Sequence, residues 1–145
     1  MHPTIFALKR AYQATRASMN EELEQYGITA AQLDVLIALN GSGPLEQQDL
    51  QEALGVSSPT IARMLTTMED ELLVHREQSS DDARRKVVSI TDEGSELLRT
   101  LEKQKEQEFT EQFLDGFNHT DAARLNWMLN TIADNMGDTS GDIFR

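Results

Sequence analysis

The apolar positions of this 145-residue chain recur mostly at helical spacing, with two short stretches that look like strands instead. The predicted helices cover residues 3–26, 29–40, 45–54, 59–72, 92–113 and 120–136. The predicted strands cover residues 74–77 and 86–90, and a polar tip at 78–85 joins them. The pattern therefore predicts a mainly α chain with six helices and a small β-hairpin.

Several of these helix ends have a defined local cause. Gly27 is placed to end the first helix, and Thr29 with Gln32 forms a capping box that starts the second. Thr91 is expected to cap the long fifth helix, and Thr120 to cap the last one. The order helix, tight turn, helix, hairpin over residues 50–91 is that of a winged helix-turn-helix, a unit that binds DNA grooves.

The helix over residues 59–72 has two distinct faces. One face is apolar and is expected to pack inward: Ile61, Met64, Leu65, Met68 and Leu72. The opposite face carries small or hydrogen-bonding side chains and one cation: Pro59, Thr60, Arg63, Thr66 and Thr67. Ser57 or Ser58 can cap its start. This polar face fits a DNA major groove, although any amphipathic surface helix has a polar side.

The hairpin tip favours DNA binding, because its residues follow a family pattern. Asp82 and Arg84 are followed, after five residues, by Ile90-Thr91 and then Gly94. In this spacing, and in the stretches 54–57 and 59–63 upstream, the chain resembles the MarR family of bacterial transcriptional regulators. The resemblance implies a winged helix-turn-helix fold and a sequence-specific DNA-binding function.

The resemblance also assigns roles to residues. Arg84 would enter the minor groove, where negative potential favours a guanidinium, and Asp82 would hold it in position. Arg85 and Lys86 would contact backbone phosphates. The helix contacts would come from Ser57, Ser58, Pro59, Thr60, Arg63, Thr66 and Thr67. Without the flanking pattern, the tip would be interpreted as an ordinary solvated charged turn.

Two positions depart from the family pattern. Leu72 stands where a glycine usually ends the recognition helix in the left-handed conformation, so the angle of the wing is expected to differ. Glu46 stands where Ser or Thr usually caps the preceding helix, and Glu is a weaker cap.

The resemblance further implies an intertwined homodimer. Residues 1–28 and 92–145 would form the helical dimerisation region, and residues 29–91 the DNA-binding region. Two recognition helices related by symmetry would bind an inverted repeat in double-stranded DNA, with half-sites about 10 bp apart. The apolar stripe of the first helix is equally compatible with packing inside one chain.

The charge of the chain complicates this interpretation. The net charge is −12, but residues 57–91 hold five cations against six acids, so most of the acidity lies elsewhere. DNA binding would then depend on a few well-placed cations and fall steeply with salt. The alternative is an acidic winged-helix module that binds proteins or mimics DNA, without operator binding.

The sequence offers no catalytic or metal-binding pattern. It lacks cysteine, and His2, His75 and His119 have no metal-ligand spacing. It also lacks a phosphate-binding loop and a nucleophile–base motif, so neither an enzyme nor a cofactor is expected. No apolar run has membrane-spanning length and no signal peptide is recognised, so a cytoplasmic protein is expected.

Many MarR relatives release DNA when a small aromatic or anionic effector binds between the dimer and DNA-binding regions. By that resemblance Tyr12 and Arg16, one turn apart on the first helix, are candidates to line such a cleft. The alternative is that Tyr12 belongs to an apolar interface and that Arg16 is a surface charge.

Overall fold

The computed structural model describes residues 1–138, 140 and 143–144. Its elements follow in the order α1 (Pro3–Leu23), a 3-10 turn η1 (Glu24–Tyr26), α2 (Ala30–Ser42), β1 (Leu45–Glu46), α3 (Gln47–Leu54), α4 (Ser58–Asp70), β2 (Val74–Gln78), β3 (Lys86–Ile90), α5 (Asp92–Phe113) and α6 (His119–Asn135). The prediction of six α-helices and a hairpin is confirmed for this part of the chain.

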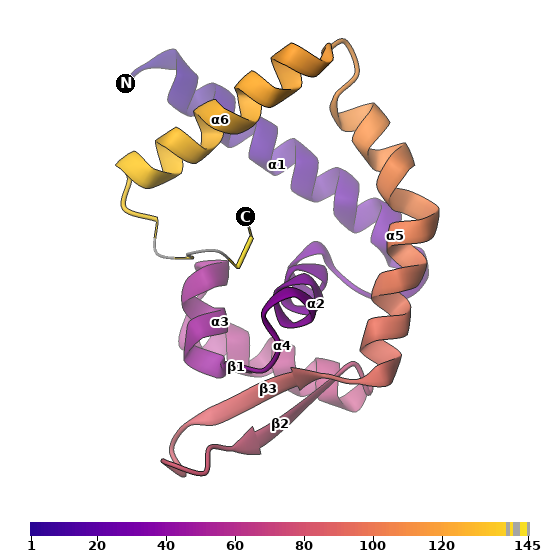
Figure 1. Cartoon of the computed structure of the whole chain (residues 1–145), viewed down its shortest axis with the longest axis vertical. Helices are drawn as coiled ribbons and strands as arrows, with labels where there is room; N and C mark the ends of the chain where they lie inside the picture. The colour runs from indigo at the N-terminus through magenta and orange to yellow at the C-terminus, as the bar shows by residue number, and fades with distance from the viewer. Residues whose placement is uncertain (139, 141–142, 145) are drawn as a thin grey trace.

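The elements divide into two ends of the molecule. Helices α2, α3 and α4 gather around the small sheet, and the β2–β3 hairpin projects at the bottom of Figure 1. The first and last helices, α1 and α6, lie at the other end, and α5 runs between the two ends (Figure 1). The winged helix-turn-helix is therefore a compact unit from which the long helices extend.

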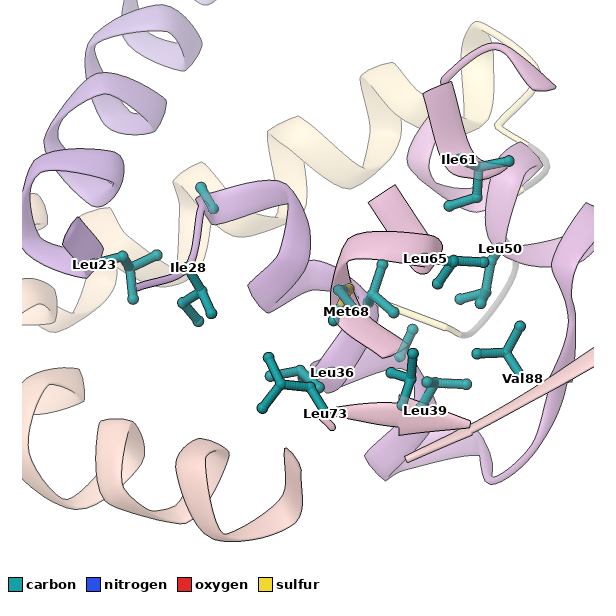
Figure 2. Packing of buried hydrophobic residues seen from close by; sticks show 14 of the residues in the cluster. Leu23, Ile28, Leu36, Leu39, Leu50, Ile61, Leu65, Met68, Leu73 and Val88 are labelled. Carbon is teal, nitrogen blue, oxygen red and sulfur yellow. The ribbon is translucent and has the colours of Figure 1, made fainter. Parts of the chain in front are cut away.

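An apolar cluster joins the helices and strands of the winged helix-turn-helix. Leu36 and Leu39 of α2, Leu50 of α3, and Leu65 and Val88 from α4 and β3 are almost completely buried. Figure 2 shows these side chains converging from the four elements. Burying a Leu or Val side chain stabilises a fold by about 1.5–3 kcal/mol, so this cluster fixes α4 and the hairpin against α2 and α3.

The sheet has one more strand than the sequence predicted. Its antiparallel order is β1–β3–β2, with Leu45 opposite Val88 and Glu46 opposite Val87. The sequence placed residues 45–46 in the first turn of the next helix, which was wrong, because that helix begins at Gln47. A two-residue strand leaves no periodicity of its own, and its partner lies about 40 residues downstream.

The helix caps follow local chemistry. Thr29 and Gln32 form the predicted capping box: the Thr29 side chain accepts from the Gln32 amide (3.2 Å), and the Gln32 side chain accepts from the Thr29 amide (2.9 Å). Thr91 caps α5 as predicted. The Thr120 prediction was wrong, because Asn118 accepts from the Asp121 amide (2.8 Å) and α6 begins one residue before Thr120. Both residue types are good caps, and the backbone geometry selects the earlier one.

Leu72 adopts the conformation that glycine adopts in the family pattern. Its φ is +61°, the left-handed region, and α4 has already ended at Asp70. The helical periodicity therefore stops before Leu72, whose side chain is 63% exposed, and the prediction that it packs inward was wrong. A left-handed Leu costs about 1–2 kcal/mol, which the surrounding contacts must offset.

Those contacts come from the exit of the hairpin. The Thr91 hydroxyl donates to the Leu72 carbonyl oxygen, and the Thr91 amide donates to the Leu73 carbonyl oxygen (3.1 Å). Gly94 lies directly against this junction: a Cβ there would collide with the Leu73 carbonyl oxygen and lie 2.9 Å from Ile90 Cγ1. Thr91 and Gly94 thus join the end of α4, the hairpin and the start of α5.

The terminal helices are scarcely packed within one chain. Leu23 is the one residue of α1 that is buried, and none of the described residues of α6 is. The sequence also predicts a loose tail over residues 138–145, in which residues 143–144 could dock. Ile143 does pack at the edge of the core, while positions 139, 141, 142 and 145 lie outside the described residues.

None of the helices in the described part of the chain combines the length and the apolar composition that a bilayer crossing requires.

Candidate DNA-binding surface

The polar face of α4 is open to solvent. Its inward residues Ile61, Leu65 and Met68 are buried and Met64 is half-buried, as the periodicity predicted. The five residues predicted for the opposite face are all exposed: Pro59, Thr60, Arg63, Thr66 and Thr67. Packing on one side thus leaves a continuous polar surface on the other, at the end of the molecule that carries the hairpin (Figure 1).

The start of α4 is fixed by Ser57 rather than by Ser58. The Ser57 hydroxyl oxygen accepts from the Thr60 amide (3.3 Å) and lies 2.8 Å from the Thr60 hydroxyl. Ser58 is the first residue of the helix and is exposed. The unsatisfied amides of a helix start favour an anion, so a backbone phosphate is a suitable neighbour for this turn.

The two threonines in the middle of α4 already use their hydroxyl protons. Thr66 donates to the Ala62 carbonyl (2.9 Å) and Thr67 donates to the Arg63 carbonyl (3.2 Å). Thr67 therefore keeps a hydroxyl oxygen that can accept, whereas the Thr66 oxygen already accepts from the Arg76 guanidinium (2.9 Å). Both side chains also carry a methyl group, which would suit the methyl of thymine. Arg63 supplies the guanidinium that can bond guanine in bidentate fashion.

The hairpin tip presents Arg84 to solvent. Asp82 accepts a hydrogen bond from the Arg84 amide (2.9 Å), and its Oδ1 lies 3.6 Å from Arg84 Nε. The Ser79 amide donates to the Arg85 carbonyl (2.9 Å), which closes the turn. The Arg84 side chain is 94% exposed, so Asp82 orders the backbone of the tip and leaves the guanidinium available.

Arg85 has an intramolecular partner. Its Nη1 lies 3.3 Å from Glu46 Oε1, and Glu46 makes no side-chain cap bond to α3. The expectation of a weak cap is therefore confirmed, and the carboxylate bonds the hairpin instead. Lys86, the next residue, is exposed at the start of β3. A phosphate that contacts Arg85 has to compete with Glu46.

A polar hollow of about 370 Å³ lies between the hairpin tip and the helix-turn-helix. It brings the basic tip together with the start of α4. Its lining comprises Glu46, Gln47, Gln48, Gln51, Ser58, Arg84, Arg85 and Lys86. The glutamines of α3 were not among the predicted site residues. One feature of the sequence could have indicated them: the helix starts with a run of polar residues, and its first apolar residue is Leu50.

Arg76 also supports this surface, and the sequence did not reveal its role. Its guanidinium bonds Glu69 (2.7 Å), Gln47 (3.3 Å) and the Thr66 hydroxyl (2.9 Å), and its backbone amide donates to Glu69 (3.2 Å). Burial acts to raise the pKa of Glu69, but the bonds and charge of Arg76 outweigh it, and the net pKa is below the usual range. Arg76 thus ties β2 to α4 and α3 and orients the exposed face of α4.

Tyr12 and Arg16 lie together on α1, as predicted. The Arg16 guanidinium carbon is 5.9 Å from the centre of the Tyr12 ring, and Arg16 Nη1 is 2.8 Å from Asp34 Oδ2 on α2. Burial raises the pKa of the Asp34 carboxyl above its usual range, although Arg16 acts to lower it. Tyr12 is 63% exposed in one chain, and the charge of Arg16 is already matched.

Among the described residues, no group of three or more His, Cys, Asp or Glu side chains is arranged to hold a metal ion. The surface offers cations, amides and hydroxyls over the DNA-binding end, which suit contacts to phosphates and base edges.

Comparisons with known proteins agree with this geometry. The family model described as MarR family matches residues 28–86. The chain is 32% identical over 102 residues to YwoH of Bacillus subtilis, an uncharacterized HTH-type transcriptional regulator, covering 70% of this chain and 73% of that protein.

Two solved structures share the fold at low identity. A mutant MarR from E. coli complexed with operator DNA superposes with a TM-score of 0.82 at 22% identity, covering 90% of this chain and 93% of that chain. BpsR of Bordetella bronchiseptica, whose DNA binding is regulated by 6-hydroxynicotinic acid, gives 0.81 at 23% identity, covering 91% and 99%. By its family model and its relatives, this chain belongs to the MarR family of DNA-binding transcriptional regulators, which are not enzymes.

Proposed function

We propose that this chain is a homodimeric, sequence-specific regulator, acting as a repressor in the cytoplasm, that binds an inverted-repeat operator. The observation that carries the proposal is the exposed polar face of α4 beside a hairpin tip whose Arg84 is 94% exposed. Such a helix fits the major groove, and a guanidinium on the adjacent wing fits the minor groove. The structurally similar E. coli MarR was solved with operator DNA.

The terminal helices support the homodimer. Large apolar side chains of α1, α6 and the segment after α5 remain exposed, among them Phe6, Tyr12, Phe117, Trp127 and Met136. Because α1 buries one residue and α6 buries none within the chain, we infer that these side chains pack at an interface. We assign residues 1–28 and 92–145 to dimerisation and residues 29–91 to DNA binding. Two symmetric copies of α4 would then bind half-sites about 10 bp apart.

The proposed contacts divide by type. Ser57, Ser58, Thr60 and the tip residues Arg85 and Lys86 would contact backbone phosphates. Base edges would be contacted by Arg63 and the remaining residues of the α4 face, Pro59, Thr66 and Thr67, and Arg84 would enter the minor groove, ordered by Asp82. With a net charge of −12, the chain has little general attraction for DNA, so these few contacts carry the affinity.

The test is selection of bound DNA from a random pool at moderate salt, followed by affinity measurements on Arg84→Ala. Loss of one groove contact should weaken operator binding by about 1–3 kcal/mol. Arg99→Ala is the matched control, because Arg99 is an exposed arginine on α5 that pairs with Glu96 within its own helix. An inverted repeat that the Arg84 variant binds less tightly supports the proposal.

Two results would count against it. Equal losses in the Arg84 and Arg99 variants would show an effect of total charge rather than of the hairpin tip. A pool without any enriched sequence, at every salt concentration tried, would favour the acidic winged-helix module that binds a protein partner or mimics DNA.

We also propose that a small molecule regulates operator binding, as 6-hydroxynicotinic acid does for BpsR. Tyr12 and Arg16 are candidates to hold an aromatic or anionic effector, since the ring and the guanidinium are adjacent. An anion at Arg16 would have to displace Asp34, which its raised pKa makes easier in mildly acidic conditions.

A further inference from the structure

The hydroxyl group of Thr66, on the exposed face of α4, forms two hydrogen bonds inside the chain. It donates to the Ala62 carbonyl oxygen (2.9 Å), and its oxygen accepts from Arg76 Nη2 (2.9 Å). The neighbouring hydroxyl of Thr67 donates to the Arg63 carbonyl oxygen (3.2 Å), and in the described part of the chain no donor reaches its oxygen. The two adjacent threonines therefore differ in what they can offer to a base.

Arg76 is held in place by partners other than Thr66. Its guanidinium bonds Glu69 (2.7 Å) and Gln47 (3.3 Å), and its backbone amide donates to Glu69 (3.2 Å). Only 12% of the Arg76 side chain is exposed. A guanidinium bonded to a carboxylate is held by strong, directional hydrogen bonds, so it cannot turn away from Thr66 without breaking them.

The two bonds of its hydroxyl also fix the methyl group of Thr66. A threonine in a helix divides between two χ1 rotamers, because its hydroxyl can bond a carbonyl in the preceding turn. The bond from Arg76 selects one position of the hydroxyl, and the methyl group on the same carbon follows. Thr66 is exposed and lies three residues after Arg63, so both side chains belong to one surface of α4.

We propose that Thr66 selects thymine at one operator position through its methyl group, and that Arg76 is the positioning residue that keeps its oxygen from accepting a base. In the major groove thymine presents a methyl group, whereas adenine and cytosine present amino groups that donate. The guanidinium charge beside the Thr66 oxygen repels a second donor, which leaves apolar contact as its means of discrimination. This inference rests on the proposed operator binding and adds the determinant of one base.

The first test removes single methyl groups from the DNA. Each thymine of the selected operator is replaced in turn by deoxyuridine, which lacks only the methyl group, and the affinity of the whole chain is measured by fluorescence anisotropy. Burial of one methyl group corresponds to about a fourfold change in affinity. We therefore expect about fourfold weaker binding when the thymine that contacts Thr66 in one half-site is replaced.

Two variants of Thr66 separate its methyl group from its hydroxyl. Thr66→Ser keeps the hydroxyl and removes the methyl, so the penalty for deoxyuridine should fall below about 1.5-fold. Thr66→Val keeps a methyl and removes the hydroxyl, so a penalty of about threefold or more should remain. Thr100→Ser is the matched control, because the Thr100 hydroxyl makes the same type of bond, to the Glu96 carbonyl of α5 (2.9 Å). It should retain the full penalty.

The role of Arg76 is tested with the double variant Glu69→Gln/Arg76→Met. It keeps the net charge and leaves no carboxylate without its partner. The freed Thr66 oxygen can then accept from the amino group of cytosine, so the preference for thymine over cytosine at that position should fall by about fivefold, the equivalent of one hydrogen bond. Discrimination at the other operator positions should change by less than about twofold, since contacts far from the mutated residues are independent. Urea unfolding of the same preparations shows that each variant is folded.

Three results would overturn the inference: no thymine is sensitive to loss of its methyl group, Thr66→Ser retains the penalty, or the double variant weakens binding to every operator by the same factor. The last result would give Arg76 a purely structural role. If no sequence is enriched from the random pool, the proposed function fails and this inference fails with it. If an operator is bound through Arg84 but tolerates deoxyuridine at every thymine, the proposed function stands and the inference alone fails.

Discussion

Replacing Glu46 by glutamine tests how the chain balances its own charges against those of DNA. The Glu46 carboxylate lies 3.3 Å from the Arg85 guanidinium and lines the hollow that also contains Arg84 and Lys86. Glutamine has nearly the same shape and leaves a hydrogen-bonding oxygen near Arg85. The substitution therefore removes one negative charge from the proposed phosphate-binding region with little change in packing.

Two contributions set the size of the effect. Arg85 is more than half exposed, and an ion pair of this kind contributes about 0.2–1 kcal/mol, which a phosphate no longer has to overcome. A carboxylate about 8 Å from a phosphate adds a repulsion of about 0.5 kcal/mol at the dielectric constant of water. Together these give about 1 kcal/mol, so Glu46→Gln should bind the operator about fivefold more tightly.

The assay is fluorescence anisotropy with the selected operator over a series of salt concentrations. If Arg85 becomes available to one phosphate, the salt dependence should steepen by up to about 0.9 in the logarithmic slope. Glu111→Gln, at the far end of α5, is the control for a general change in charge. The gain should disappear when Arg85→Ala is combined with Glu46→Gln. An unchanged or weaker affinity, or an equal gain in the control, would refute the reasoning.

Three further predictions concern stability. Leu72→Gly should be more stable than Leu72→Ala by about 1 kcal/mol in urea unfolding, because glycine alone relieves the left-handed φ of +61°; equal stabilities would contradict that strain. Gly94→Ala should lower the free energy of unfolding by about 3 kcal/mol, since its Cβ meets the Leu73 carbonyl, whereas Gly41→Ala in α2, with open space around it, should be neutral or stabilising. The pKa of Asp34 is raised in the folded chain, so the folded state binds a proton at Asp34 more tightly than the unfolded state does. The stability gained from this proton is fully present below the unfolded pKa of Asp34. It is lost as the pH rises through the folded pKa of Asp34. The stability of the wild type relative to Asp34→Asn should therefore increase between pH 7 and about pH 4, and a decrease would contradict the direction of the shift.

The features that the sequence predicted well depend on neighbours within one helical turn. The Thr29–Gln32 capping box, the two faces of α4 and the Thr91 cap each involve residues three or four apart. Their geometry is set by the helix itself, so spacing alone is informative. The tip pattern Asp82–Arg84 was informative only through the family resemblance, and the structure adds that Asp82 accepts from the Arg84 amide.

The features that the sequence did not predict depend on partners far along the chain. Strand β1 exists because residues 45–46 pair with residues 87–88, and the Arg76 bonds reach Gln47 across 29 residues. Leu72 shows a different limit. Helical periodicity, extended past the end of α4, places the Leu72 side chain inward. The left-handed backbone of Leu72 itself turns that side chain outward. Spacing cannot identify such a reversal when the residue is not glycine.

The junction at Thr91 also fixes one end of α5, so that a movement at the other end tilts the whole helix. With 22 residues, α5 is about 33 Å long, and its first turn is fastened to the end of α4 and the hairpin. A displacement of about 3 Å at its far end corresponds to a tilt of about 5° at the fastened end, given that length. Half-sites one helical turn apart require two recognition helices about 34 Å apart. In the proposed dimer, small sliding movements among the terminal helices would therefore be enough to move the two copies of α4 away from the spacing of the DNA half-sites.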